Sequence, residues 1–485
     1  MNYRMVVFVL GRIFLVEAAM MLLPMACSAI YGEWYMLPAF LLPAVILLLL
    51  GLAASLRTPK NTTIYARDGL AIVALVWVLM SAFGALPFVI SGEIPAFADA
   101  FFEMVSGFTT TGSTILNDVE ALSHGALFWR SFSHWVGGMG VLVFAMAVLP
   151  MTDGRAMHLM RAEVPGPTCG KLSSKLSDSA KILYGIYFAM TALEVVFLCA
   201  GGMSLYESLI HSFGTAGTGG FSNRGLSIGA YQNPYFEWVI GIFMLLFGVN
   251  FNLYYFILMR HFREAFGSEE LRAYLGIVLF STVTIAANIL SMVGSVGEAV
   301  RTAFFHVSSI ITTTGYATAD FNLWPTYSRI LLLVLMFVGG CAGSTAGGLK
   351  MSRVIIVFKA ARQDLNKMLH THAVTTIRFE GKPLDEKTLQ GVHNYFNVYM
   401  LLIMLSTVLV SLDGFDLTTT FSAVITCINN VGPGMELVGP MGNFSQFSAP
   451  VKYLLSFDML AGRLELYPML AMFAPRLWRS RRTMR

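Results

Sequence analysis

Apolar runs of about 20 residues recur along the chain and predict segments that span a membrane. Two such runs come first, at residues 5–30 and 37–56. Further runs follow in four pairs, at residues 70–90 and 127–149, 182–199 and 238–258, 275–293 and from 330 onward, and 395–412 and 451–473. This hydrophobic pattern therefore predicts ten full crossings.

A shorter apolar stretch lies between the two spans of each pair and ends in a glycine-centred turn. We expect these stretches to form re-entrant half-helices near residues 99–108, 205–214, 298–310 and 415–427. The four turns read SGFTTTGS, TAGTGGFS, SSIITTTGY and CINNVGPG, with central glycines Gly112, Gly220, Gly315 and Gly432. Paired phenylalanines stand eleven and ten residues before both Gly112 and Gly315, so the similarity covers a whole helix and turn. The chain thus contains four repeats of helix, half-helix, turn and helix.

Composition favours an all-α integral membrane protein. Of 485 residues, 56% are hydrophobic and 12% are charged, and the mean hydropathy is +0.67. This is more apolar surface than one soluble core can bury. The five cysteines form no CxxC pair, which argues against a metal cluster or a disulfide framework. Because the sequence shows no nucleotide motif or catalytic triad, we expect no enzyme, no covalent cofactor and no nucleic-acid partner.

Basic residues between the repeats predict the orientation. Arg57, Lys60 and Arg67 follow the second span, and a run of five arginines at residues 476–485 ends the chain. Because cytoplasmic loops are enriched in Lys and Arg, both termini are expected in the cytoplasm. The expected domains are an N-terminal pair of helices (1–60) and pore repeats at 61–150, 151–260, 261–392 and 393–485, the third with a gating loop and a cytoplasmic loop.

The glycine-centred turns are the candidate selectivity filter. Irregular backbone at membrane depth is tolerated only where it is buried in protein or lines an aqueous cavity. A ring of backbone carbonyls can replace the water shell of a monovalent cation, and the partially negative C-terminal ends of the half-helices would favour a cation there. The predicted filter residues are Thr110, Thr111, Gly112, Thr218, Gly219, Gly220, Thr313, Thr314, Gly315, Asn430, Val431 and Gly432.

Other polar residues of the half-helices have two interpretations each. Acidic residues near the outer ends either attract cations to the pore mouth or simply cap the helices. These are Asp99, Glu207, Glu298 and Asp416. The histidines His211 and His306 are expected to be buried packing residues rather than ligands.

A run of small residues, GGCAGSTAGG at 339–348, interrupts the second span of the third repeat. If that span begins near Pro325, Gly339 lies about 21 Å below the outer face at about 1.5 Å per residue, which places the run beneath the filter. Such backbone favours a pore-lining gate, although small residues also suit close packing between helices. The predicted gate residues are Gly339, Gly340, Gly343, Ser344, Thr345, Gly347, Gly348, Lys350 and Arg463.

Arg463 lies in the last apolar span at a similar depth, about 18 Å at about 1.5 Å per residue. A cation there is costly unless it is paired, and no carboxylate stands three or four residues away on its own helix. We expect Arg463 to reach across the pore to a carboxylate or to carbonyls of residues 339–348, and to oppose cation passage. The alternative is a structural ion pair inside the bundle.

The four turn motifs, TTTGS and TTTGYATAD together with TAGTGGFS and NNVGPG, resemble those of TrkH-type subunits in the bacterial Trk/Ktr potassium uptake superfamily, to which plant HKT transporters are related. The resemblance covers essentially the whole chain, including the two N-terminal spans that distinguish TrkH-type from Ktr-type subunits. It implies a homodimer in the bacterial cytoplasmic (inner) membrane, with one pore per protomer and K⁺ as the transported ion. In plant relatives a serine at the first filter glycine accompanies sodium preference, so Gly112 favours potassium. The implied K⁺ contacts are Thr111, Gly112, Thr218, Gly219, Thr314, Gly315, Asn430 and Val431.

The same resemblance implies a cytosolic, TrkA-like regulatory ring that binds NAD or ATP. The basic segment at residues 359–387 follows the gate-bearing span and offers it a surface, although it also fits an ordinary positive-inside loop. Two functional classes remain. A gated, channel-like potassium pore is favoured because the filter consists of Thr, Gly and carbonyl groups. A proton- or sodium-coupled symporter would need a titratable group in the pathway.

Overall fold

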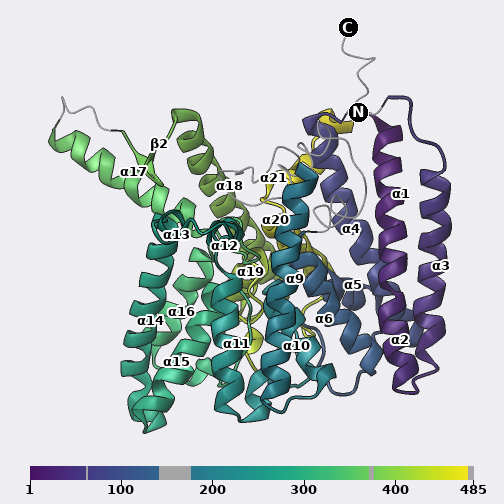
Figure 1. Cartoon of the computed structure of the whole chain (residues 1–485), viewed down its shortest axis with the longest axis horizontal. Helices are drawn as coiled ribbons and strands as arrows, with labels where there is room; N and C mark the ends of the chain where they lie inside the picture. Colours follow the sequence, from purple (N-terminus) through teal and green to yellow (C-terminus); the bar gives the residue numbers. More distant parts are fainter. Residues whose placement is uncertain (62–63, 141–175, 371–375, 479–485) are drawn as a thin grey trace.

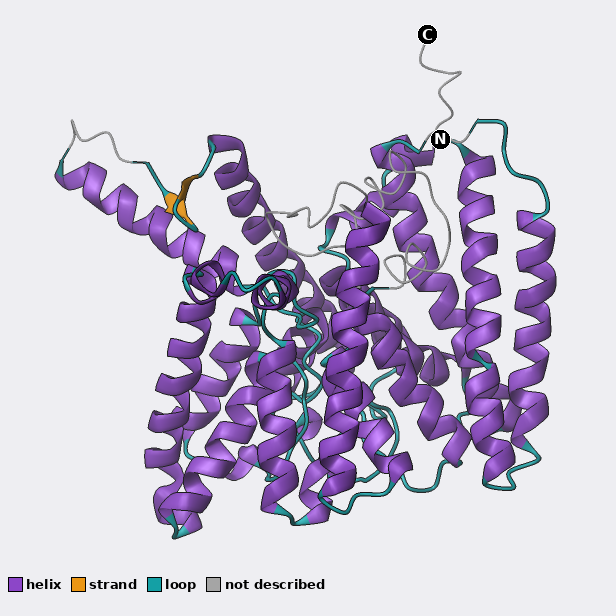
Figure 2. Cartoon of the chain, in the orientation of Figure 1, coloured by secondary structure: helices purple, strands orange, loops and turns teal. Residues whose placement is uncertain are grey.

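The computed structural model describes residues 1–61, 64–140, 176–370 and 376–478, and most of these residues are helical (Figure 1, Figure 2). The N-terminal part contains α1 (Tyr3–Met20), α2 (Leu22–Ile30) and α3 (Met36–Ser55). The first repeat contains α4 (Ala66–Ser91), the half-helix α5 (Phe97–Phe108) and α6 (His124–Gly138). The second repeat contains α9 (Leu176–Ala200), the half-helix α10 (Leu205–Gly217), η1 (Ser227–Tyr231), α11 (Pro234–Phe247), α12 (Phe251–Leu258) and α13 (Phe262–Phe266).

The third and fourth repeats follow the same order. The third contains α14 (Glu269–Val293), the half-helix α15 (Val296–Ile311), η2 (Phe321–Leu323), α16 (Thr326–Val338) and α17 (Met351–Leu369). A hairpin of two short antiparallel strands, β1 (Arg378–Phe379) and β2 (Lys382–Pro383), leads to the fourth repeat. That repeat contains α18 (Glu386–Val410), η3 (Ser411–Asp413), the half-helix α19 (Leu417–Ile428), η4 (Glu436–Val438), α20 (Ala449–Arg463), α21 (Tyr467–Met472) and α22 (Pro475–Trp478).

The four repeats close into a ring. Each half-helix packs against the long helix and the second helix of its own repeat, and also against the second helix of the preceding repeat. The contacts between repeats are α10 with α6, α15 with α11, and α19 with α16. The ring closes because α5 of the first repeat packs against α20 of the fourth. The predicted all-α architecture of four repeats around one axis is therefore confirmed.

The second helix of each repeat is shorter than the hydrophobic pattern predicts. Within the described residues, six helices are long and apolar enough to cross a membrane, or seven if α11 and α12, which meet at 92°, count as one span. α16 ends before Gly339 and α20 ends before Leu466, both of which have positive φ angles. The predicted total of ten crossings counts each of these runs as one span. The structure divides the run of the second repeat between Phe247 and Phe251, and the run of the third repeat after Val338, where the sequence predicts an interruption. In the fourth repeat, α20 ends within the predicted span at 451–473. The end of the predicted span at 127–149 lies outside the described residues.

The N-terminal helices pack on the outside of the first repeat. α1 and α3 contact each other, and both contact α4. A Cβ added at Gly11 would lie 2.6 Å from the Cβ of Ala54, so small residues allow the two helices to approach closely. The hydroxyl of Tyr3 donates to the carbonyl of Trp478, so both ends of the described chain lie at one face, which also carries α17 (Figure 1). The arginines of the predicted basic tail that lie beyond Trp478 are outside the described residues.

Candidate ion-permeation site

Each half-helix ends in the same reversal of the backbone. The residue two positions before the central glycine is left-handed in every turn, with φ of 54–57° at Thr110, Thr218, Thr313 and Asn430. In the first repeat the N–H of Thr111 donates to the carbonyl of Ser106, and the other three repeats repeat this bond. This Schellman arrangement satisfies carbonyls at the end of the helix and turns the chain away. The turns at residues 110–112, 218–220, 313–315 and 430–432, here called the filter turns, therefore leave their helices in the same way.

The central glycines interlock around the ring. Each one faces the carbonyl oxygen of the residue that precedes the glycine of the next repeat. The distances from an added Cβ to that oxygen are 2.0 Å from Gly112 to Gly219, 2.0 Å from Gly220 to Thr314, 2.3 Å from Gly315 to Val431 and 2.8 Å from Gly432 to Thr111. All four glycines also have φ between 75° and 102°. No side chain fits at these positions, because it would meet the neighbouring backbone.

Threonine hydroxyl groups brace the first and third filter turns. The side-chain oxygens of Thr109 and Thr111 lie 2.7 Å apart, and those of Thr312 and Thr314 are also 2.7 Å apart. The hydroxyl of Thr109 donates in addition to the carbonyl of Val105, 2.6 Å away. These threonines therefore stabilise the turn through their side chains.

The second and fourth filter turns use other groups. A Cβ added at Gly219 would lie 2.4 Å from the imidazole of His134, so this ring from α6 occupies the space of the missing side chain. His134 is buried, and its Nδ1 lies 2.7 Å from the carbonyl oxygen of Gly107. In the fourth turn the amide of Asn430 donates to the hydroxyl of Thr111 over 2.9 Å. His134 was not among the residues predicted from the sequence, where its only signal is a polar ring within an apolar run.

A polar side chain of each half-helix holds the segment that follows its filter glycine. The four hydrogen-bonded pairs are Glu103 Oε2 with Ile115 N (3.0 Å), His211 Nε2 with Ser222 Oγ (3.0 Å), His306 Nε2 with Ala319 O (3.1 Å), and Ser422 Oγ with Met435 N (3.0 Å). Both histidines are fully buried, as expected from the sequence. Glu103 and Ser422 were not among the residues predicted from the sequence. Glu103 stands nine residues before its filter glycine, as His211 and His306 do, whereas Ser422 stands ten residues before Gly432.

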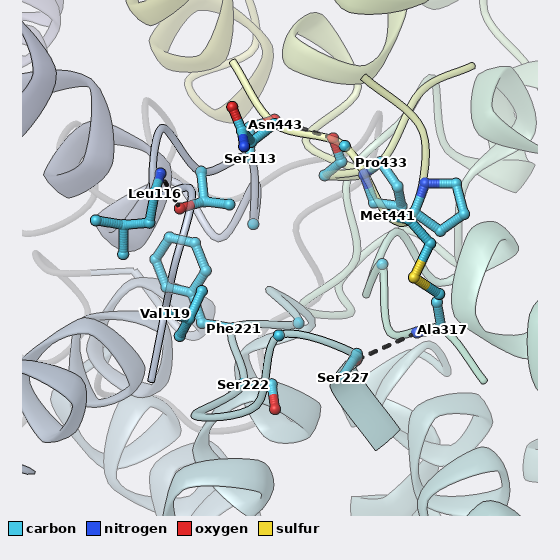
Figure 3. Close-up of a pocket in the computed structure, with 18 of the residues that line it drawn as sticks. Ser113, Leu116, Val119, Phe221, Ser222, Ser227, Ala317, Pro433, Met441 and Asn443 are labelled. Atoms are coloured by element: carbon cyan, nitrogen blue, oxygen red, sulfur yellow. Dashed lines mark hydrogen bonds between the residues drawn. The ribbon is translucent and has the colours of Figure 1, made fainter. Parts of the chain in front are cut away.

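The four filter glycines open onto one pocket (Figure 3). Gly112, Gly220, Gly315 and Gly432 all line it. Residues that follow these glycines form the walls, among them Ser113, Phe221, Ala317 and Pro433, one from each repeat. Because all four repeats contribute to it, the pocket lies on the axis of the ring. It adjoins the filter glycines and the segments that follow them.

The predicted gate residues other than Arg463 lie in one loop, residues 339–350, here called the intramembrane loop after its predicted position. It contacts the third filter turn and the residue that precedes the fourth. The N–H of Gly347 donates to the hydroxyl oxygen of Thr313 over 2.6 Å. The N–H of Gly348 donates to the carbonyl of Asn429 over 3.0 Å. A Cβ added at Gly347 would lie 2.2 Å from that same carbonyl oxygen, so glycine permits the close approach. The loop therefore lies directly against the third filter turn and the C-terminal end of α19. Its depth in the membrane stays a prediction.

The intramembrane loop is also fastened to the broken helix of the second repeat. The N–H of Cys341 donates to the carbonyl of Gly248 over 2.9 Å, and the N–H of Phe251 donates to the carbonyl of Gly343 over 3.1 Å. Both contacts lie at the bend between α11 and α12. The bend leaves backbone N–H and carbonyl groups without partners in a helix, and the loop forms hydrogen bonds with them. A break in an apolar span is tolerated where the freed backbone groups are satisfied in this way.

Glu270, in the first turn of α14, holds both ends of the intramembrane loop. Its Oε1 accepts hydrogen bonds from the N–H of Ala342 over 2.7 Å and from the N–H of Ser352 over 2.9 Å. The carboxylate is buried, with 5% of the residue exposed. From the sequence this residue looks like an ordinary acidic residue at a helix start, so its role was missed.

Arg463 reaches the intramembrane loop from α20. Its guanidinium donates to the carbonyl of Thr345 over 2.8 Å, and to the carbonyls of Gly137 and Gly138 over 2.5 and 2.6 Å. The predicted contact with loop carbonyls is therefore present. The two glycine carbonyls lie at the C-terminal end of α6, where a helix favours a cation. Lys350, also predicted at the gate, is buried and donates to the carbonyl of Ala346.

The acidic residues at the outer ends of the half-helices are mostly engaged. Asp99 pairs with Lys452 at 2.6 Å, and Glu207 pairs with Arg224 at 2.9 Å. Asp416 caps α19 by accepting from the N–H of Thr419 over 3.0 Å, and hydrogen bonding with Thr419 lowers the pKa of Asp416. These contacts show the capping and pairing roles, whereas attraction of cations stays a prediction.

Comparisons with known proteins agree with this architecture. Residues 37–480 match the model of a family described as TrkH, cation transport protein. The potassium uptake protein TrkH of Escherichia coli K12 is 34% identical over 490 residues, covering 99% of this chain and 100% of the relative. TrkG of the same strain, also a potassium uptake protein, is 34% identical over 485 residues, covering 99% of each. The crystal structure of the potassium transporter TrkH from Vibrio parahaemolyticus is similar with a TM-score of 0.89 at 30% identity, covering 99% of this chain and 100% of that one. This chain therefore belongs to the TrkH family of cation transport proteins.

Proposed function

We propose that this chain is the potassium-conducting membrane subunit of a bacterial Trk-type uptake system. The observation that carries the proposal is the ring of four filter turns, in which each glycine packs against the backbone of the next repeat. Such a ring can present carbonyl oxygens to a dehydrated monovalent cation. The names of the E. coli relatives support potassium as that cation.

In this proposal K⁺ binds at the filter turns, with the half-helices pointing their partially negative C-terminal ends at it. The contacts are those predicted from the sequence, at residues 111–112, 218–219, 314–315 and 430–431. The bracing of the turns by Thr109, Thr312 and His134 supports the assignment, because a filter needs a backbone that is held in place.

The intramembrane loop and Arg463 would act as the gate. Two cations 4 Å apart repel by about 4 kcal/mol at an effective dielectric near 20, so a guanidinium in the path opposes K⁺. The contacts of the loop with Thr313 and Asn429 support a closed state that blocks the pathway under the filter. Opening would then require the loop to leave these two residues and Arg463 to release Thr345.

Control would come from a cytosolic, TrkA-like ring that binds NAD or ATP, acting on a homodimer in the inner membrane with both termini in the cytoplasm. α17 supports this arrangement, because it begins directly after the intramembrane loop and extends from the ring at the face of both described chain ends (Figure 1). A partner that moves α17 would pull on the loop. Within the basic segment at residues 359–387, residues 371–375, which include His372, lie outside the described residues.

The alternative function is potassium symport coupled to protons or sodium, and one observation supports it. Asp458 of α20 is fully buried and accepts a hydrogen bond from Ser406 over 2.8 Å. Its second carboxyl oxygen has no hydrogen-bond partner within the described part of the chain. A buried carboxyl of this kind can hold a proton, which a coupled carrier would need.

Uptake of rubidium, a potassium analogue, into liposomes containing the purified protein tests transport. Single-channel recording separates the mechanisms, because a coupled carrier turns over too slowly to give unitary currents. Rubidium uptake that needs a proton gradient and is lost in Asp458→Asn would support symport. Uptake no greater than that of empty liposomes, with a TrkA-type partner and nucleotide present, would contradict the proposed function.

A further inference from the structure

We infer that the buried ion pair between Glu103 and Arg130 sets the spacing of the first two filter turns and thereby the preference for K⁺ over Na⁺. The inference rests on the proposed function. Glu103 lies in the half-helix α5 and Arg130 in α6, and the Nε of Arg130 is 2.7 Å from Oε1 of Glu103. The two residues are 0% and 1% exposed. Arg130 lines the pocket at the filter glycines and Glu103 does not. Both act as positioning residues, because their contacts are with chain segments that leave the filter turns.

The carboxylate of Glu103 holds the chain that leaves the first filter turn. The hydroxyl of Thr114 donates to it over 2.9 and 3.1 Å, and the N–H of Ile115 donates over 3.0 Å. Thr114 and Ile115 follow Gly112 by two and three residues. The position of Gly112 along the ring axis therefore depends on this carboxylate.

The guanidinium of Arg130 extends the link to the second repeat. Its central carbon lies 3.9 Å from the centre of the Phe221 ring, a cation–π contact, and its Nη1 donates to the carbonyl of Ser222 over 3.4 Å. Phe221 and Ser222 directly follow Gly220. Arg130 thus contacts the segment that follows the second filter turn, while Glu103 holds the segment that follows the first filter turn. The close approach of Gly112 to the carbonyl of Gly219 occurs at this same junction.

The ion pair is particular to one side of the ring. At the corresponding place the other described half-helices use His211, His306 and Ser422, which make hydrogen bonds and no ion pair in the described structure. Hydrogen bonds between charged groups are about twice as strong as those between neutral groups, and removal of one member of a buried ion pair leaves an uncompensated charge in the interior. Whether a filter selects by cavity size or by the number of carbonyls, its selectivity depends on how those carbonyls are held. The first two turns are therefore the rigid half of this filter.

The test compares K⁺ and Na⁺ permeability of reconstituted full-length variants. Glu103→Gln combined with Arg130→Gln removes both charges, so no lone buried charge remains to prevent folding. We expect this double variant to fold and to lose about tenfold in its K⁺ to Na⁺ permeability ratio. Glu103→Asp keeps the charge but shortens the reach, and should show an intermediate ratio. Glu237→Gln combined with Arg301→Gln is the matched control, because Arg301 of α15 forms its ion pair with Glu237 of α11, at 2.9 Å, outside the filter turns.

Thermal unfolding of the same samples separates positioning from general stability. If the ion pair only stabilised the fold, the K⁺ to Na⁺ permeability ratio would fall only when the protein becomes less stable. A double variant with wild-type thermal stability would then have the wild-type ratio. Our inference predicts a low ratio in a stable protein. A wild-type ratio in the folded double variant overturns the inference alone, while a wild-type protein without preference for K⁺ would overturn the proposed function as well.

Discussion

The N–H of Gly347 donates a hydrogen bond of 2.6 Å to the side-chain oxygen of Thr313. Gly347 belongs to the intramembrane loop and Thr313 to the third filter turn, where it has the left-handed φ of 57°. The proposed gate and the proposed filter are thus in direct contact. Displacement of the loop must release Thr313, so a change at either site is expected to affect the other.

Thr313→Val should weaken the closed state. Valine has nearly the shape of threonine but cannot accept the hydrogen bond of Gly347, and an unsatisfied buried N–H costs about 1–3 kcal/mol. Rubidium uptake without a regulatory partner is therefore expected to rise about fivefold or more. Thr110→Val is the matched control, because Thr110 has the same φ of 56° in the first turn and donates its hydroxyl hydrogen bond to Thr109. Equal uptake in both variants would contradict a loop held by Thr313.

Gly112→Ser should shift the preference from potassium toward sodium, by about tenfold in the permeability ratio. The new Cβ would meet the carbonyl oxygen of Gly219 at 2.0 Å, so the two turns must separate. Gly92→Ser is the control, because Gly92 has a similar φ of 79° with no neighbouring atom within 4 Å of an added Cβ. Permeability ratios in reconstituted vesicles provide the measurement. An unchanged ratio in Gly112→Ser would remove Gly112 from the filter.

Arg463→Ala should raise basal cation uptake in the absence of any partner. Loss of the guanidinium removes a repulsion of about 4 kcal/mol at 4 Å and an effective dielectric near 20, and it also removes the bond to Thr345. We expect uptake to increase by about one to two orders of magnitude. Deletion of part of residues 339–348 should act in the same direction. Arg329→Ala, which breaks a pair with Glu436 away from the loop, is the control. Unchanged or reduced uptake in both gate variants would leave the loop as a packing feature.

Glu270→Ala should also open the pore, because it removes the acceptor for the N–H groups of Ala342 and Ser352 at both ends of the loop. Hydrogen bonds to charged groups contribute about 1.5–3 kcal/mol each, so the variant should also unfold at a lower temperature. Glu270→Gln is the matched variant, since one amide oxygen can accept both bonds. We expect nearly wild-type uptake from the glutamine variant and raised uptake from the alanine variant. Similar uptake from the two would show that the loop ends need no acceptor at residue 270.

The sequence allowed much of the fold and part of the site to be predicted. The half-helix expected at 205–214 is α10 (Leu205–Gly217), and Gly220 in the turn after it has a positive φ of 75°. The depth of Arg463, with no carboxylate on its own helical face, predicted a contact with a carboxylate or with carbonyls of residues 339–348, because a buried cation needs an acceptor. The structure shows the carbonyl of Thr345 as one acceptor. The roles of these residues in ion binding and gating stay predictions.

The sequence by itself determined the four repeats, the half-helices and the glycine turns, because apolar periodicity and turn chemistry act between near neighbours along the chain. Only the tertiary structure decided which backbone groups the interrupted helices share, and which side chains meet across the repeats. The hydrogen bonds of Arg130 with Glu103, of Ala342 with Glu270 and of Arg463 with Thr345 join residues that are 27, 72 and 118 positions apart in the sequence. Such pairs depend on how the repeats pack around the ring. Patterns among neighbouring residues do not contain information about that packing. The contacts between repeats that hold the filter turns and the intramembrane loop can therefore be identified only from the tertiary structure.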